Sequence, residues 1–140
     1  MMTHRTLITG ASGDIGKEIA MQFANQGHLL VLHYHHNRSA IDEIISKVPK
    51  EQILDIIQAD LSVKEGLDQF LKLLPRQLDH FIFTSGFTYF GLFQDMTDQQ
   101  MDNMLHLHLK APPWKIVQHL IPDMLHQRIG KIVMITSIWG

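Results

Sequence analysis

Short apolar runs alternate along the chain with segments in which apolar residues recur every three or four positions. The first pattern indicates buried β-strands, and the second indicates amphipathic helices. The run over residues 29–32 is apolar on both faces, which is typical of a strand covered by helices on both sides. Five strands are predicted in this way, over residues 6–9, 28–35, 52–59, 80–84 and 131–136.

Helical segments lie between these strands. The first has an apolar stripe that begins at Ile15, and it ends at Gly27, where a left-handed cap is expected. The last helical region spans residues 101–125, and Pro112 and Pro113 predict a bend or a restart within it. Strands that alternate with helices through short connections favour a doubly wound parallel α/β sheet with right-handed crossovers.

A glycine-rich turn joins the first strand to the first helix. Gly10 can adopt the dihedrals of a tight turn, Gly13 leaves room for a phosphate, and Gly16 lets the helix pack closely on the strand. Free N–H groups and the helix dipole face this turn, so it is predicted to hold a dinucleotide pyrophosphate. An ordinary turn of small residues is the alternative. The residues assigned to cofactor binding here are Gly10, Ala11, Ser12, Gly13, Asp14, Ile15 and Gly16.

The composition is that of an ordinary globular domain. The 140 residues are 45% apolar and 19% charged, and no apolar run is long enough to span a bilayer. The net charge is −2 with scattered basic residues, so we expect a small-molecule partner and neither nucleic acid nor membrane. The chain has no cysteine, and its start passes into a strand without a signal-peptide segment, so a cytoplasmic location is expected.

Ten histidines are many for this length, and His33, His35 and His36 lie near the end of one predicted strand. These three residues are candidate metal ligands. No cysteine or carboxylate cluster joins these residues, so surface or loop histidines are favoured and no metal site is predicted.

The carboxyl ends of parallel strands meet at one edge of a sheet, and ligands bind there. The predicted strands end in polar or glycine residues, so we expect the ligand at this edge. These ends are residues 10–16, 34–38, 60–61, 84–86 and 136–137.

The sequence over residues 9–16, 60–61, 85–86 and 130–140 resembles the N-terminal part of the short-chain dehydrogenase/reductase family, in particular its 3-oxoacyl-carrier-protein-reductase-like members. The resemblance implies a Rossmann-like fold and NAD(P)-dependent conversion between a small-molecule carbonyl and its alcohol. Residues 1–140 are then expected to be a single dinucleotide-binding domain that stops after the fifth strand.

The resemblance also implies roles for individual residues. Asp60 would bond the adenine amino group, and Leu61 would line the adenine slot. Thr84, Ser85 and Gly86 stand where the family has Asn-Ala-Gly and would lie beside the cofactor. The two residues with implied catalytic roles are Ser137, which would orient the substrate carbonyl, and His108, which aligns with the asparagine that holds a proton-relay water.

The cofactor choice depends on the end of the second strand. NAD-preferring members of the family carry an acidic residue there, and this chain has Tyr34. Arg38, with His35 and His36, could meet a 2′-phosphate, so NADP(H) is predicted. NAD stays possible, because Arg38 could be a solvated residue at a helix start and because Gly13 stands where NADP-specific relatives often place a basic residue.

The family's proton donor is the tyrosine of a Tyr-x-x-x-Lys motif. Neither tyrosine here, Tyr34 or Tyr89, is followed by lysine four residues later, so we expect the 140-residue chain alone to be inactive. The alternatives are a non-catalytic nucleotide-binding module or partner subunit, and a member of the sugar-nucleotide-modifying branch. The apolar fifth strand and the apolar stripe of the last helical region predict a homo-oligomer, or the ordered part of a longer polypeptide.

Overall fold

The computed structural model describes residues 3–84, 92–107 and 111–135. Its strands form one sheet in the order β3-β2-β1-β4-β5, and every neighbouring pair is parallel. This order reverses direction at β1, between β2 and β4, which confirms the predicted doubly wound sheet. The strands are β1 (Arg5–Thr9), β2 (Leu29–Tyr34), β3 (Ile53–Gln58), β4 (His80–Phe83) and β5 (Lys131–Met134).

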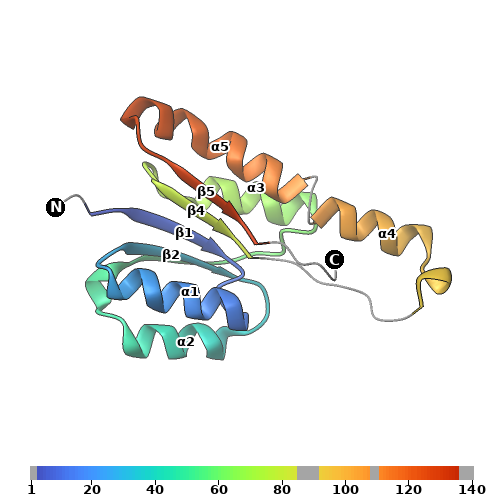
Figure 1. Cartoon of the computed structure of the whole chain (residues 1–140), viewed down its shortest axis with the longest axis horizontal. Helices are drawn as coiled ribbons and strands as arrows, with labels where there is room; N and C mark the ends of the chain where they lie inside the picture. Colours follow the sequence, from blue (N-terminus) through green and yellow to red (C-terminus); the bar gives the residue numbers. More distant parts are fainter. Residues whose placement is uncertain (1–2, 85–91, 108–110, 136–140) are drawn as a thin grey trace.

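Helices cover both faces of the sheet (Figure 1). The helices α1 (Asp14–Asn25) and α2 (Arg38–Lys47) lie on one face, and α3 (Lys64–Leu73) and α5 (Ala111–Gln127) lie on the other. The helix α4 (Asp98–Leu105) extends beyond the carboxyl ends of the strands. Two short 3-10 helices, η1 (Lys50–Gln52) and η2 (Phe93–Asp95), precede β3 and α4.

Two hydrophobic cores result, one on each face. Leu7 and Ile8 follow each other in β1 and point to opposite faces, and both are fully buried. On one side Ile8 packs with the residues of α1 and α2, such as Ile41. On the other side Leu7 packs with α3 and α5, where Phe70 and Ile116 are fully buried. The central strands are therefore apolar on both faces, as the sequence pattern predicts.

The structure extends the first predicted strand by one residue, to Arg5, and shortens the other four at their ends. The third strand begins at Ile53 because residues 50–52 form a 3-10 turn, in which the Gln52 amide donates hydrogen bonds to the carbonyl oxygens of Ala24 and His28. The fifth strand ends at Met134 rather than at residue 136, which lies outside the described residues.

The prolines of the last helical region fit the predicted restart. The helix α4 ends at Leu105 and α5 begins at Ala111, so Pro112 and Pro113 occupy the first turn of α5, where a missing N–H costs no helical hydrogen bond. Pro122 lies inside α5, and the helix continues through it. Gly27 has a φ of 85°, which confirms the predicted left-handed residue after α1.

An apolar surface runs along the β5 edge and α5. All four residues of β5 are exposed, including Ile132 and Val133, and Trp114 and Leu125 of α5 are exposed as well. This surface is the structural basis for expecting a covering partner. Within the described ranges, no helix has the length and apolar character needed to cross a membrane.

Candidate functional site

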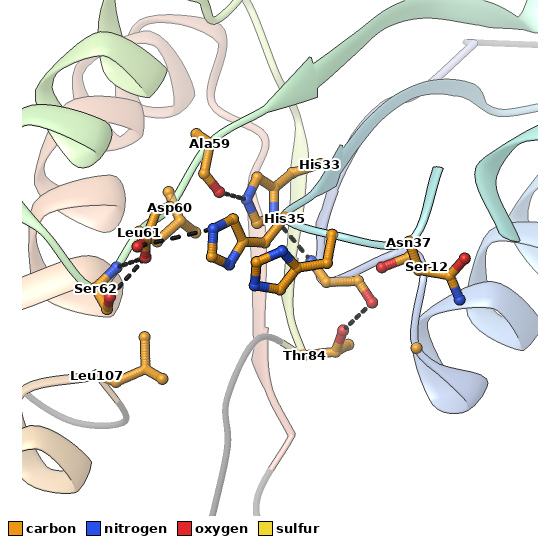
Figure 2. Close-up of a pocket in the computed structure, with 13 residues that line it drawn as sticks. Ser12, His33, His35, Asn37, Ala59, Asp60, Leu61, Ser62, Thr84 and Leu107 are labelled. Atoms are coloured by element: carbon orange, nitrogen blue, oxygen red, sulfur yellow. Dashed lines mark hydrogen bonds and ion pairs between the residues drawn. The ribbon is translucent and has the colours of Figure 1, made fainter. Parts of the chain in front are cut away.

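A cavity of about 520 Å³ opens at the carboxyl ends of the strands (Figure 2). It therefore lies at the topological switch point between β2 and β4, where ligands bind in doubly wound sheets. The lining residues are Gly10, Ser12, Gly13, His33, His35, His36, Asn37, Ala59, Asp60, Leu61, Ser62, Thr84 and Leu107.

The turn between β1 and α1 requires glycine at two positions. Gly10 has a φ of 71°, in the left-handed region that favours glycine. A Cβ at Gly16 would lie 2.2 Å from the carbonyl oxygen of Gly10 and 2.9 Å from the Thr84 hydroxyl. The helix α1 therefore packs against the strand end more closely than any side chain would allow.

The N-terminus of α1 faces the cavity without a side-chain cap. Gly13 is the N-cap residue, and a Cβ there would meet nothing closer than 3.5 Å. The first-turn N–H groups, which have no partner within a helix, are thus left for an anion. Asp14 places an exposed carboxylate in the same turn, where it suits the helix dipole but repels a phosphate.

The placement of Ile15 in the apolar stripe of α1 is wrong. Its side chain is 59% exposed, and the buried stripe begins at Gly16 and continues through Ala20 and Ala24. The reason is geometric, since Ile15 stands one helical step away from the face that packs on the sheet. Ile15 therefore lies in solvent beside the uncapped turn.

The expectation of surface or loop histidines fails for His33. This residue is in β2 and is 2% exposed, and both ring nitrogens are hydrogen bonded. Nδ1 accepts from the N–H of Gly10 at 3.0 Å, and Nε2 lies 2.9 Å from the carbonyl oxygen of Ala59. The ring contacts the edge of Phe70, and burial lowers the pKa of His33 to about 4.

The end of β3 carries the residues implied in adenine binding. The Asp60 Oδ1 accepts hydrogen bonds from the Ser62 N–H at 3.0 Å and hydroxyl at 2.5 Å. Burial by itself would raise the pKa of Asp60, but these bonds and the nearby His35 and His36 lower it. Leu61 is buried and lines the cavity.

A second close approach was missed by the sequence analysis. A Cβ at Gly66 would lie 2.0 Å from the carbonyl oxygen of Asp60, so α3 meets the end of β3 as closely as α1 meets the end of β1. The signal was available, because Gly66 follows Asp60 at the same distance along the chain as Gly16 follows Gly10.

Two of the three residues predicted to meet a 2′-phosphate, His35 and His36, lie at the β2 end of the cavity, and Arg38 stands outside its lining. The rings of His35 and His36 are 3.7 Å apart between centroids, and both line the cavity. Arg38 follows the last lining residue on this side and is exposed. Its guanidinium lies over the Tyr34 ring and pairs with Asp42 at 3.0 Å. Exposed pairs of this kind are weak, so Arg38 is free to exchange partners.

Thr84 connects the end of β4 to the glycine turn. Its hydroxyl donates to the carbonyl oxygen of Thr9 at 2.5 Å and lies 3.1 Å from that of Gly10. Four other predicted site residues, Ser85, Gly86, His108 and Ser137, lie outside the described residues. In the part of the chain that the structure describes, no group of three histidines or carboxylates is placed to hold a metal ion.

Comparison with known proteins agrees with this geometry. Residues 4–140 match the family model described as short chain dehydrogenase. The uncharacterized oxidoreductase YmfI of Bacillus subtilis is 37% identical to the chain, and the alignment covers 99% of this chain and 58% of that protein. A 3-oxoacyl-[acyl-carrier-protein] reductase FabG of Staphylococcus epidermidis is 28% identical, with the same two coverages.

Solved structures show the same likeness. A short-chain dehydrogenase from Sphingobium yanoikuyae in complex with NADPH superposes with a TM-score of 0.81 at 26% identity, covering 96% of this chain and 54% of that one. The chain thus spans little more than half the length of these relatives. Because the family match extends over nearly the whole sequence, the chain belongs to the short-chain dehydrogenase family.

Proposed function

We propose that these residues are the cofactor-binding portion of an NAD(P)-dependent oxidoreductase that interconverts a carbonyl and an alcohol, as in 3-oxoacyl reductases. The observation that carries the proposal is the first turn of α1, which has no side-chain cap. Its N-cap residue, Gly13, lines the cavity together with Gly10 and Thr84. Such a turn binds a pyrophosphate through backbone N–H groups, without a lysine. The Staphylococcus relative is a 3-oxoacyl-[acyl-carrier-protein] reductase by name, which supports the substrate class.

The residues of the cavity fit a dinucleotide along its length. The turn from Gly10 to Gly16 would hold the pyrophosphate, and the buried side of Leu61 with Asp60 would hold the adenine. Leu107 lines the cavity as a further apolar wall. The bound nicotinamide supplies the hydride, and the protein supplies position and electrostatics. Ser137 would donate a hydrogen bond to the substrate oxygen, and His108 would hold a water near it.

The first test is the cofactor preference of the full-length protein. We expect NADPH to bind more tightly than NADH, because two histidines line the cavity after β2, Arg38 begins α2 beside them, and β2 ends in Tyr34 rather than in a carboxylate. Replacing Arg38→Ala should weaken NADPH binding about tenfold and leave NADH binding unchanged, since a charge-assisted hydrogen bond is worth about 1.5–3 kcal/mol. Lys47→Ala, at the other end of α2, is the matched control. Tighter binding of NADH by the wild type would contradict the preference.

The second test concerns the 140 residues by themselves. We expect no carbonyl reduction by this purified chain with either cofactor, because these residues contain no Tyr-x-x-x-Lys and a positioned general acid contributes roughly 10²–10⁴-fold.

The same chain should be oligomeric, since the exposed β5 edge favours pairing with another chain. Turnover, or a stable monomer by light scattering, would contradict the respective expectation. Cofactor binding by the full-length protein without turnover of any carbonyl tested would favour a non-catalytic nucleotide-binding module.

A further inference from the structure

His33 occupies a place between the two halves of the cavity. It lies near the carboxyl end of β2, with the glycine turn on one side and the end of β3 on the other (Figure 2). Its Nδ1 is 3.0 Å from the N–H nitrogen of Gly10, and its Nε2 is 2.9 Å from the carbonyl oxygen of Ala59. A single buried ring therefore joins the turn at the pyrophosphate side to the residue that precedes Asp60.

The partners of His33 determine which form of the ring fits. The Gly10 N–H can donate but not accept, and the Ala59 carbonyl can accept but not donate. Both bonds therefore require a neutral ring with its proton on Nε2. A charged ring would turn an N–H toward the Gly10 N–H, and the bond to the turn would be lost. Burial, which lowers the pKa of His33, keeps the ring neutral; the charge of His35 acts in the same direction, and that of Asp60 opposes it.

The main chain of His33 adds a third bond to the same turn. The N–H of Ala11 donates to the carbonyl oxygen of His33 at 2.9 Å. The N–H groups of two successive residues of the turn, Gly10 and Ala11, thus both donate hydrogen bonds to His33. Neither of these N–H groups is then available to a phosphate, so their part is to fix the path of the turn.

We propose that His33 is a positioning residue for the nucleotide: it fixes the glycine turn against the Ala59–Asp60 end of β3 and so sets the spacing between the pyrophosphate and adenine subsites. The inference rests on the proposed function, because it assumes that these subsites hold a dinucleotide. His33 itself touches the backbone on both sides and acts on the ligand through Gly10 and Ala59.

Two substitutions separate the bonds that His33 makes. His33→Leu removes both side-chain bonds, and His33→Asn keeps an acceptor near the position of Nδ1 but is too short to reach Ala59. We expect His33→Leu to raise the Kd for NADPH about tenfold or more, since the Gly10 N–H loses its acceptor and the turn is no longer held at the spacing that the bound nucleotide needs. His33→Asn should recover part of this loss. The Kd for adenosine 2′-monophosphate, which has no pyrophosphate, should change less than about twofold in both variants, because it engages one subsite only.

His28 provides the matched control. It is a buried histidine directly before β2, at the opposite end of the strand, and its Nδ1 is 2.8 Å from the Thr6 hydroxyl. His28→Leu is expected to change stability but to leave the ratio of the two dissociation constants at its wild-type value. This control separates loss of a buried histidine from loss of the contact with the turn.

A measurement on the wild type is independent of any substitution. The ring-nitrogen NMR shifts of His33 at pH 6 should be those of the neutral form protonated on Nε2. A ring that is charged, or that carries its proton on Nδ1, would overturn the inference, even if His33→Leu fails to fold.

The outcomes also separate this inference from the proposed function. Failure of the wild-type full-length protein to bind NADPH would overturn both. Tight NADPH binding by the wild type and equally by His33→Leu would overturn only the positioning role. Equal weakening of NADPH and adenosine 2′-monophosphate would also overturn it, since a general loss of structure affects both ligands.

Discussion

Replacing Gly16→Ala should destabilise the protein by about 3 kcal/mol and weaken NADPH binding by tenfold or more. The new Cβ would lie 2.2 Å from the Gly10 carbonyl oxygen, a backbone atom, so the turn or α1 must move by about 1 Å to reach ordinary contact. Forced overpacking typically costs about 1–3 kcal/mol, and here no flexible side chain can yield. The same movement displaces the N–H groups that face the cavity. Urea unfolding and cofactor titration of the full-length protein measure the two effects.

Gly13→Ala is the matched control for stability. Gly13 has a φ of −78°, which any residue adopts, and a Cβ there meets its nearest atom at 3.5 Å, an ordinary contact. We expect its free energy of unfolding to stay within about 0.5 kcal/mol of the wild type. If Gly16→Ala unfolds at the same urea concentration as Gly13→Ala, the close approach of α1 to β1 is refuted.

Stability should fall steeply as the pH drops from about 6.5 toward 4. Burial lowers the pKa of both His33 and His80 to about 4, and for His80 the neighbouring His4 and His28 act in the same direction. The unfolded chain, whose histidines titrate near 6.5, then binds more protons than the folded one in this window. The stability that depends on these neutral histidines is fully present above about pH 6.5, their pKa in the unfolded chain. It is lost as the pH falls toward about 4, their pKa in the folded chain. For His33, whose ring is buried, the shift corresponds to about 3 kcal/mol.

The rings of His4, His28 and His80 form a cluster at the amino ends of the strands. The rings of His4 and His80 stack at 4.6 Å, and that of His28 lies 5.2 Å from His80, so adding charge to one ring disfavours charge on the others. Asp79, whose Oδ2 is 3.8 Å from the His4 ring, opposes this effect in part. A loss of about 3 kcal/mol at His33 alone is a large part of the net stability of about 5–15 kcal/mol of a typical domain.

Urea unfolding between pH 7.5 and 4.5 tests the pH dependence. His80→Gln removes one of the titrating groups and should make the fall shallower, whereas His126→Gln, at an exposed position of α5, should leave it unchanged. A free energy of unfolding that is flat between pH 7 and 5 would show that these histidines are not buried in neutral form. Carboxylates with lowered pKa values, such as Asp60, lose their contribution only at still lower pH.

The sequence predicted the sheet because its periodicity is strong. A strand such as β2, apolar on both faces, can be stable only between two helical layers, and the structure places it there. Strand ends were less predictable, since backbone pairing decides them. The turn at residues 50–52 depends on Gln52 bonding to carbonyls of α1 and the following turn, which no local pattern encodes.

The site was predictable where it depends on backbone shape and less so where it depends on burial. Gly10 and Gly16 are read from spacing alone, because only glycine fits a left-handed turn or such a close approach. His33 could not be assigned in this way. Its ring is buried because Ala59 and Gly10, distant in sequence, supply a matching acceptor and donor, and such a match is visible only in three dimensions. The prediction for Ile15 fails because its apolar side chain suits a core, but the buried face of α1 begins one residue later, at Gly16.

The central position of β1 has a consequence for how the chain folds during synthesis. Thr6 pairs with Leu30 on one side and with His80 on the other, so β1 and β2 can associate while the far edge of β1 still lacks its partner. About 50 further residues must be made before β4 emerges, which takes roughly 2–10 s at ordinary translation rates. During that time the edge of β1 that later pairs with β4 is unpaired in the ribosome-bound chain. The order of the strands therefore leaves the nascent chain open to wrong strand pairing until β4 has been made.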